Sequence, residues 1–115
     1  MSIERIQPAQ WNARAVVHNG IAYLSGVVAD DKLASISEQT VEVLAKIDAV
    51  LGEAGTDKSK ILSSVVYIAD MQQKDEMNEV WIDWIGSKHL PARACVGVDL
   101  TANTKVEIMV IAAIE

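Results

Sequence analysis

The chain has 115 residues, which gives room for one hydrophobic core, so we predict a single domain over residues 1–115. Half of the residues are hydrophobic, and ten Lys and Arg against sixteen Asp and Glu leave a net charge of −6 with no basic cluster. This charge disfavours nucleic acid and anionic membrane surfaces as partners. The first residues lack the apolar run of a signal peptide, and no stretch approaches the roughly 20 apolar residues that cross a bilayer, so we expect a cytoplasmic protein.

One cysteine and two histidines limit the metal and redox chemistry of the chain. As the single cysteine, Cys95 can form neither an internal disulfide nor a cysteine-rich zinc site. We interpret it as a small buried strand residue rather than a reactive thiol. His18 and His89 are far apart in the sequence and do not have the spacing of metal ligands on one element. We therefore predict no metal.

The first predicted elements are a hairpin and a helix. Two short apolar runs in residues 13–25 are joined by Asn-Gly at 19–20, a pair that tolerates positive φ and favours a tight β-turn. Ser35 and Glu38 then have the spacing of a capping box, and apolar residues recur at helical spacing after them. Gly55 is expected to end this helix.

The second half of the chain predicts a strand, a helix and two more strands. Residues 61–69 are rich in β-branched residues, and the helix that follows ends at Gly86. Its apolar stripe comprises Met77, Val80, Trp81, Trp84 and Ile85, in which we interpret the tryptophans as core anchors. Residues 93–98 and 105–114 predict strands joined by the turn DLTANT. The order ββαβαββ, with hairpins at both ends, indicates an α+β domain whose helices cover one face of a sheet.

The last two predicted strands contain two charged residues within apolar surroundings. Glu107 is the only charged residue in the run 106–114, and Arg93 begins the preceding strand. If the turn pairs Cys95 with Glu107, Arg93 and Glu107 lie diagonally across the two strands, roughly 7 to 8 Å apart. A slip of one residue would place them on opposite faces. They form a functional site, or they simply sit at the strand ends or form a structural ion pair. Arginine has the planar fork that holds a small carboxylate.

Two segments carry a resemblance to a known family. PARACVGVDL at residues 91–100 and KVEIMVIAAI at residues 105–114 resemble the reactive intermediate deaminase (Rid, YjgF-like) family, and within it the shorter YoaB-like branch. Weaker similarity extends over nearly the whole chain, including YLSG at residues 23–26 and MNEVW at residues 77–81. The resemblance implies a chorismate-mutase-like (YjgF-like) α+β subunit with one mixed sheet and two helices on one face. It also implies a homotrimer with its sites in the clefts between subunits.

The resemblance implies an activity and the residues that perform it. Reactive enamines and imines such as 2-aminoacrylate and 2-iminopropanoate would be hydrolysed to 2-oxo acids and ammonia without a cofactor. Arg93 falls on the carboxylate-binding arginine of the family, and Glu107 on the glutamate that positions water. Cys95 falls on the position whose backbone helps to hold that water. The partner is then a small carboxylate, a 2-imino or 2-oxo acid.

The remaining predicted site residues also follow from the resemblance. Ser25 and Gly26 match the opposite wall of the cleft, and Asn78 matches a helix residue near it. The tyrosine that lines the family's pocket has no match, since a gapless alignment places Asn12 there, beside Trp11. Two alternatives to the deaminase are a non-catalytic trimeric sensor of 2-oxo acids or related metabolites, and a chaperone-like protein-binding role.

Overall fold

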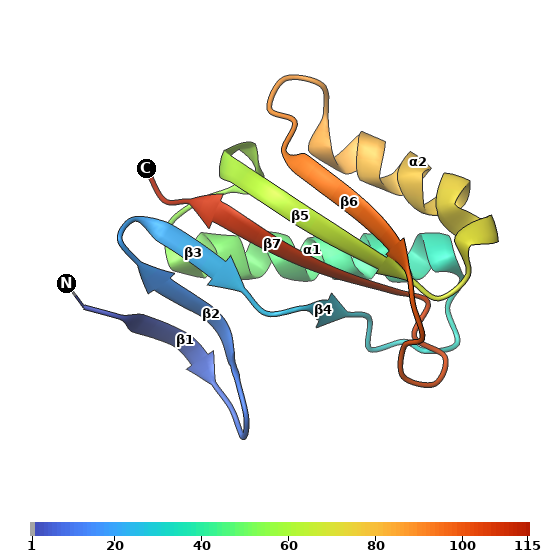
Figure 1. Cartoon of the computed structure of the whole chain (residues 1–115), viewed down its shortest axis with the longest axis horizontal. Helices are drawn as coiled ribbons and strands as arrows, with labels where there is room; N and C mark the ends of the chain where they lie inside the picture. Colours follow the sequence, from blue (N-terminus) through green and yellow to red (C-terminus); the bar gives the residue numbers. More distant parts are fainter. Residues whose placement is uncertain (1) are drawn as a thin grey trace.

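A computed structural model describes residues 2–115, which form one mixed seven-stranded sheet with two α-helices packed on one face (Figure 1). In chain order the elements are β1 (Glu4–Pro8), β2 (Ala13–His18), β3 (Ile21–Leu24), β4 (Val27–Val28), α1 (Ile36–Ala54), η1 (Lys58–Lys60), β5 (Ile61–Ile68), η2 (Met71–Gln73), α2 (Lys74–Ile85), β6 (Ala92–Gly97) and β7 (Val106–Ala113). The predicted α+β class is confirmed. Strands β1 and β4 were not predicted from the sequence.

Local signals determine the ends of several elements. The β2–β3 hairpin turns at Asn19 and Gly20, whose φ angles are 53° and 75°, so both lie in the left-handed region that a tight turn of this kind requires. The predicted capping box of α1 is confirmed, because the Ser35 hydroxyl accepts from the Glu38 N–H and the Glu38 carboxylate accepts from the Ser35 N–H. Gly55, with φ 86°, ends α1 as expected.

The strand order corrects the predicted C-terminal hairpin. The strands lie in the order β1-β2-β3-β7-β5-β6, with β4 also paired to β7, so β5 lies between β6 and β7. Strand β5 pairs with β6 in parallel and with β7 antiparallel. The cause is the strand-helix-strand unit β5-α2-β6, since a helical crossover returns the chain parallel to the strand it left. The proposed pairing of Cys95 with Glu107 was therefore wrong.

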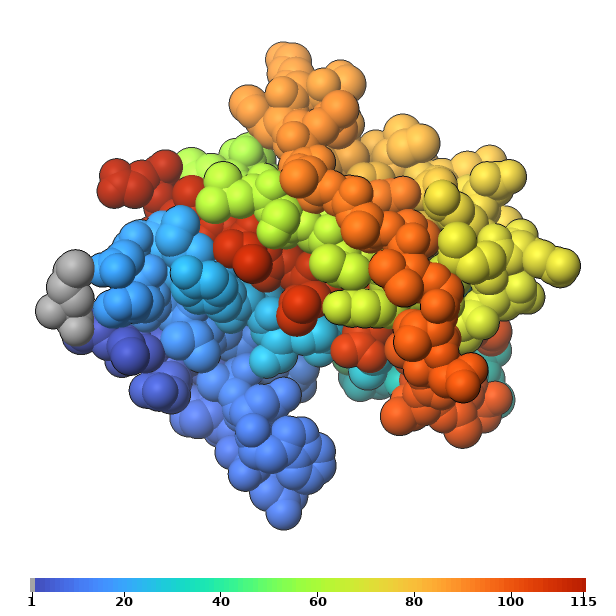
Figure 2. Space-filling model, in the orientation of Figure 1, coloured from blue at the N-terminus to red at the C-terminus, as the bar shows by residue number. Residues whose placement is uncertain are grey.

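The two faces of the sheet have different surroundings. Helices α1 and α2 cover one face and enclose a core that includes Val106, Ile108, Val110 and Ala112 of β7. Neither α1 nor α2 covers the opposite face, which is the front surface in Figure 2. Several of its side chains are apolar and at least partly exposed, namely Tyr23, Val65, Tyr67, Val96, Met109 and Ile111. Neither α-helix in residues 2–115 is long and apolar enough to cross a membrane.

Candidate functional site

Arg93 lies at the edge of the sheet, on the face covered by helices. It pairs with Ser64 of β5, whose side chain is buried, and the half-buried Arg93 side chain reaches α2. Its guanidinium carbon lies over the Trp81 ring, 5.2 Å from the centroid, and Nη1 lies 3.9 Å from the sulfur of Met77. Met77 and Trp81 are four residues apart on α2 and therefore share one helix face. Together they form a support for the guanidinium, which we call the Arg93 cradle.

The charge of Arg93 has no acidic partner in residues 2–115. The ion pairs in this part of the chain join Lys46 to Asp30 and to Glu42. A thioether is a weak acceptor and an aromatic ring attracts the cation through its face, so most of the guanidinium N–H groups stay available. An arginine in this state is well suited to bind an anion, and a planar carboxylate matches its fork.

Two other predicted site residues lie on the elements that carry or support Arg93. Cys95 is two residues further along β6 and therefore on the same face, where it is half-buried against the core rather than fully buried. Asn78 follows Met77 on α2, and its Oδ1 atom is buried without a hydrogen-bond partner in the described chain. A buried acceptor without a donor is uncommon, so Asn78 Oδ1 lacks a hydrogen-bond donor that residues 2–115 do not supply.

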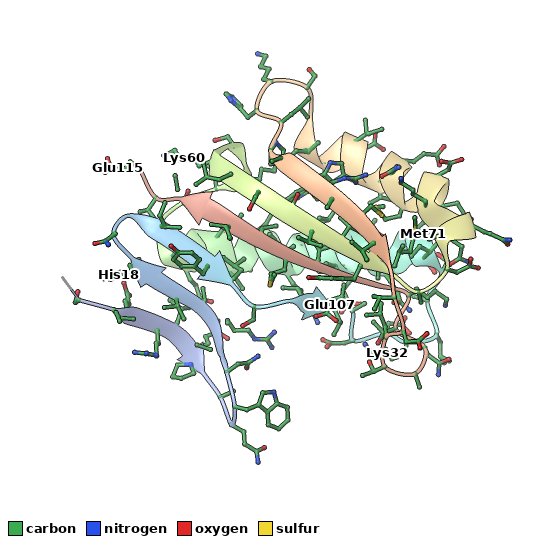
Figure 3. The ribbon with its side chains drawn as sticks, in the orientation of Figure 1. His18, Lys32, Lys60, Met71, Glu107 and Glu115 are labelled. Carbon is green, nitrogen blue, oxygen red and sulfur yellow. The ribbon has the colours of Figure 1, made fainter. Side chains whose placement is uncertain are left out.

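Glu107 lies on the other face of the sheet. It alternates with Val106 and Ile108, which are fully buried, so its side chain projects away from the helices, near β4 (Figure 3). Its carboxylate lies against Gly26, because a Cβ atom at Gly26 would overlap Oε2 and stand 3.1 Å from Cδ of Glu107. Glycine at position 26 therefore leaves the space that the Glu107 carboxylate occupies. Gly26, which was predicted to line the opposite wall of the cleft, therefore lies directly beside the glutamate within one chain.

Ser25 sets the bend that places Gly26 beside Glu107. Its hydroxyl donates to the carbonyl oxygen of Ala13 at 2.6 Å, and its N–H donates to the carbonyl oxygen of Arg14 at 3.0 Å. Both bonds tie the segment between β3 and β4 to β2. The Ser25 hydroxyl thus donates its hydrogen bond to the backbone of β2, so Ser25 supports the segment that places Gly26 beside Glu107.

The Glu107 carboxylate faces a shallow hollow of about 280 Å³ on the open face. Besides Glu107, the hollow is lined by Tyr67, Val98, Asp99, Leu100 and Met109. Tyr67 is the cross-strand partner of Glu107 on β5. Two carboxylates, those of Glu107 and Asp99, thus lie among apolar walls. The sequence had indicated that Met109 shares a strand face with Glu107, but it had not indicated Tyr67 as a neighbour.

Gln39 fixes the start of the strand that carries Glu107. This fully buried residue of α1 accepts from the Lys105 N–H at 2.9 Å and donates to the carbonyl oxygen of Asn103 at 3.0 Å. The Lys105 ammonium also donates to the carbonyl oxygen of Ala34 at 2.6 Å. These bonds hold the loop before β7 against the beginning of α1, two residues before Glu107. The carboxylate therefore projects from a fixed backbone.

Within one chain the predicted site residues do not come together. Arg93 and Glu107 project from opposite faces of the sheet, so the predicted diagonal contact is absent. Trp11 and Asn12 lie in the β1–β2 turn, at an end of the molecule remote from α2 (Figure 1), and Trp11 is 83% exposed. The predicted residues therefore fall into two groups, which we call half-sites: the Arg93 half-site, with Cys95 on the same strand and Asn78 on α2, and the Glu107 half-site, with Ser25 and Gly26.

A larger hollow of about 360 Å³ lies between α1 and α2 and includes none of the predicted site residues. It is lined by Val41, Leu44, Ala45, Asp48, Val80, Asp83 and Trp84. Of its two carboxylates, Asp48 accepts from the Trp84 indole N–H at 2.9 Å. Within residues 2–115, no three His, Cys, Asp or Glu side chains gather closely enough to hold a metal ion. The unpaired guanidinium and the recessed carboxylate therefore remain the stronger candidates for chemistry.

The fold and the two half-sites describe a small α+β protein that offers an unpaired arginine at a sheet edge and a glutamate on an open sheet face. The family model described as Endoribonuclease L-PSP matches residues 2–114. The RutC family protein YoaB of Escherichia coli (strain K12) is 39% identical over 116 residues, which covers 99% of this chain and 100% of that protein.

Solved structures agree with this match. A member of the YjgF protein family from Neisseria meningitidis has a TM-score of 0.96 and 38% identity, and the match covers 100% of this chain and 97% of that one. A protein of the conserved Rid family from Yersinia pestis has a TM-score of 0.88 and 33% identity, with 97% and 99% covered. The chain belongs to this Endoribonuclease L-PSP family, whose members are also named RutC, YjgF and Rid. The resemblance drawn from residues 91–114 is confirmed.

Proposed function

We propose that this protein hydrolyses reactive 2-imino acids to 2-oxo acids and ammonia, at a site that two copies of the chain complete. The observation that carries the proposal is the Arg93 guanidinium, which is half-buried, supported by Trp81 and without an acidic partner in residues 2–115. A cation in this state favours a small carboxylate ligand. Membership of a family that includes deaminases supports the same conclusion.

The second copy follows from the placement of Arg93 and Glu107 on opposite faces. A single substrate of a few atoms cannot contact both residues of one chain, because the sheet lies between them. Strand β6 is the last strand of the sheet and has a free edge, and the uncovered face is apolar. A cyclic homotrimer would cover this apolar face and give three clefts, each with Arg93 from one subunit and Glu107 from the next.

The proposed reaction uses these two residues in separate roles. Arg93 holds the substrate carboxylate, which places the imine carbon in reach of a water molecule on Glu107. Glu107 accepts a proton from the water as the new C–O bond forms, and the electron pair of the C=N bond moves to the nitrogen, which takes up a proton. Glu107 then returns its proton to the nitrogen of the resulting carbinolamine, the hydroxyl proton leaves to solvent as the C–N bond breaks, and ammonia and the 2-oxo acid are released. No oxidant or reductant takes part.

The walls of the Glu107 hollow favour this chemistry. Val98, Leu100 and Met109 give the hollow apolar walls, so that among its lining side chains the groups besides Glu107 that could accept from water are Asp99 and the Tyr67 hydroxyl. The endoribonuclease in the family description is a weaker candidate for this chain, because a net charge of −6 opposes binding of a phosphate backbone. A sensor of 2-oxo acids would use the same arginine without turnover. We favour the enzyme because Glu107 adds a base that a carboxylate sensor does not need.

The test is imine hydrolysis with a substrate generated in place. A serine or threonine dehydratase supplies 2-aminoacrylate or its 2-imino homologue, and its disappearance is followed with and without the protein. Faster loss that rises with protein concentration supports the deaminase. Saturable binding of a 2-oxo acid without faster loss supports the sensor. If the protein neither speeds the loss of imine nor binds a 2-oxo acid, the proposal is contradicted and the chaperone-like role remains.

A further inference from the structure

We infer that Trp81 is a positioning residue for Arg93: its ring holds the guanidinium through the π face and so keeps the in-plane N–H fork free for a carboxylate. This inference rests on the proposed function, because it assigns the reason why Arg93 stays available to a ligand. The supporting observations are the 5.2 Å separation of the guanidinium carbon from the Trp81 centroid and the missing acidic partner in the described chain.

The geometry distinguishes Trp81 from an ordinary core residue. An arginine that leaves water commonly pairs with Asp or Glu, and such a partner occupies the same N–H groups that bind a ligand carboxylate. An aromatic ring instead stabilises the cation through the π face of the ring, which offers no carboxylate oxygen to occupy those N–H groups. The sulfur of Met77, 3.9 Å from Nη1, is only a weak acceptor. The cradle therefore orients Arg93 and leaves its charge uncompensated.

Trp81 is itself held in place. It is buried, and its ring packs against Trp84 with centroids 5.6 Å apart and planes tilted by 55°. The Trp84 indole donates to Asp48 of α1 at 2.9 Å, and the Lys58 ammonium lies 5.2 Å from the Trp84 centroid. Each of the two neighbouring indoles thus lies beside one cation, Arg93 at Trp81 and Lys58 at Trp84. Only the cation on Trp81 belongs to a predicted site, which makes Trp84 a matched control.

The expected effect is on binding more than on the chemical step. Replacement of Trp81 by Leu removes the face that orients Arg93, so the guanidinium samples more rotamers and a ligand must order it. We expect Trp81→Leu to weaken carboxylate binding about tenfold, the range of a partly desolvated cation–π contact. The KM should rise by a similar factor with a smaller change in kcat. Trp81→Phe, which keeps a ring face, should restore most of the affinity.

The experiment compares the intact protein with Trp81→Leu, Trp81→Phe and Trp84→Leu. Calorimetry measures the Kd for pyruvate, the imine assay gives kcat and KM, and thermal melting reports stability for each preparation. Trp84→Leu also loses an indole and should lower the melting temperature, but it leaves the Trp81 face beside Arg93, so it should weaken pyruvate binding much less than Trp81→Leu. If both leucine variants weaken binding equally, or Trp81→Leu leaves Kd and KM unchanged, Trp81 is only a packing residue and the inference fails.

Nuclear magnetic resonance keeps the inference testable if Trp81→Leu does not fold. The Arg93 side-chain signals, assigned by their loss in Arg93→Lys, should be shifted upfield by the ring current of Trp81 in the parent protein. Unshifted signals would overturn the inference without any variant of Trp81. Failure of the proposed function has a different signature, because the parent itself would then neither bind pyruvate nor hydrolyse imines.

Discussion

The two half-sites differ in what the chain provides for each of them. Around Arg93, residues 2–115 supply a support of apolar groups, Met77 and Trp81, but no compensating charge. Around Glu107 it supplies space, since Gly26 leaves room for the carboxylate, and an open apolar hollow. In the proposed function, one half holds a carboxylate anion and the other holds water beside a base. Because Arg93 and Glu107 lie on opposite faces, the proposal separates binding from proton transfer and requires a second copy of the chain to unite them.

This difference predicts the largest effect for the proton-transfer half. Glu107→Gln keeps the size of the side chain and its ability to accept a hydrogen bond, but an amide cannot take a proton from water. We expect kcat to fall by about a hundredfold, the lower range of general-base contributions. The Kd for pyruvate should change little. Turnover at the parent rate would mean that Glu107 only orients water or is structural.

The binding half should respond in the opposite way. Arg93→Lys keeps the positive charge but loses the planar fork, which removes charge-assisted hydrogen bonds worth about 1.5 to 3 kcal/mol. The Kd for pyruvate should therefore rise by roughly one to two orders of magnitude, with thermal stability nearly unchanged. Calorimetry and melting on the same preparation measure both quantities. A destabilised variant with parent-like turnover per folded subunit would show that Arg93 is a structural residue.

A smaller change sharpens the steric part of the comparison. Gly26→Ala should displace the Glu107 carboxylate, because the new methyl group overlaps Oε2, and we expect a loss of about tenfold in kcat. Gly52→Ala is the matched control, since a Cβ at Gly52 in α1 meets nothing within 4 Å. Alanine is also the better helix former, so Gly52→Ala should raise stability slightly and leave turnover unchanged. Equal turnover in both variants would show that the Gly26 contact is not needed.

The sequence was most informative where the cause of a structure is local. The capping box of Ser35 and Glu38, the turn at residues 19–20 and the end of α1 at Gly55 follow from signals within a few residues. Strand β1 was missed because it has one buried side chain, Ile6, and β4 because it has only two residues. Neither strand has enough apolar alternation to be recognised.

The site was predicted by residue type but not by arrangement. The resemblance selected Arg93 and Glu107, but pairing across the sheet depends on contacts between distant segments, so the assumed β6–β7 register was wrong. One signal was overlooked, since a strand, a helix and a strand in succession favour a parallel pair and put β5 beside β6. The Arg93 cradle was also missed, because Trp81 was interpreted only as a core anchor, although Met77 and Trp81 are one helical turn apart.

The smallest expected effect lies outside both half-sites. A hydrogen bond from the backbone N–H of Ser35 lowers the pKa of Glu38 from its ordinary value of 4.5. The folded state prefers the ionised form, so this stabilisation is complete above pH 4.5 and is lost as the pH falls through the lower folded pKa. Glu38→Gln should melt slightly below the parent at neutral pH and together with it in strong acid. Imine turnover at neutral pH should not change.

Subunit mixing tests most directly whether two copies complete the site. Arg93→Lys and Glu107→Gln proteins, each nearly inactive alone, are unfolded, combined in equal amounts and refolded. If Arg93 and Glu107 act across an interface, each mixed trimer has one cleft in which both residues are intact. Random mixing should then restore about a quarter of the parent activity. If the mixture forms trimers but stays as inactive as its components, the two residues do not meet between subunits, and the proposed site is contradicted.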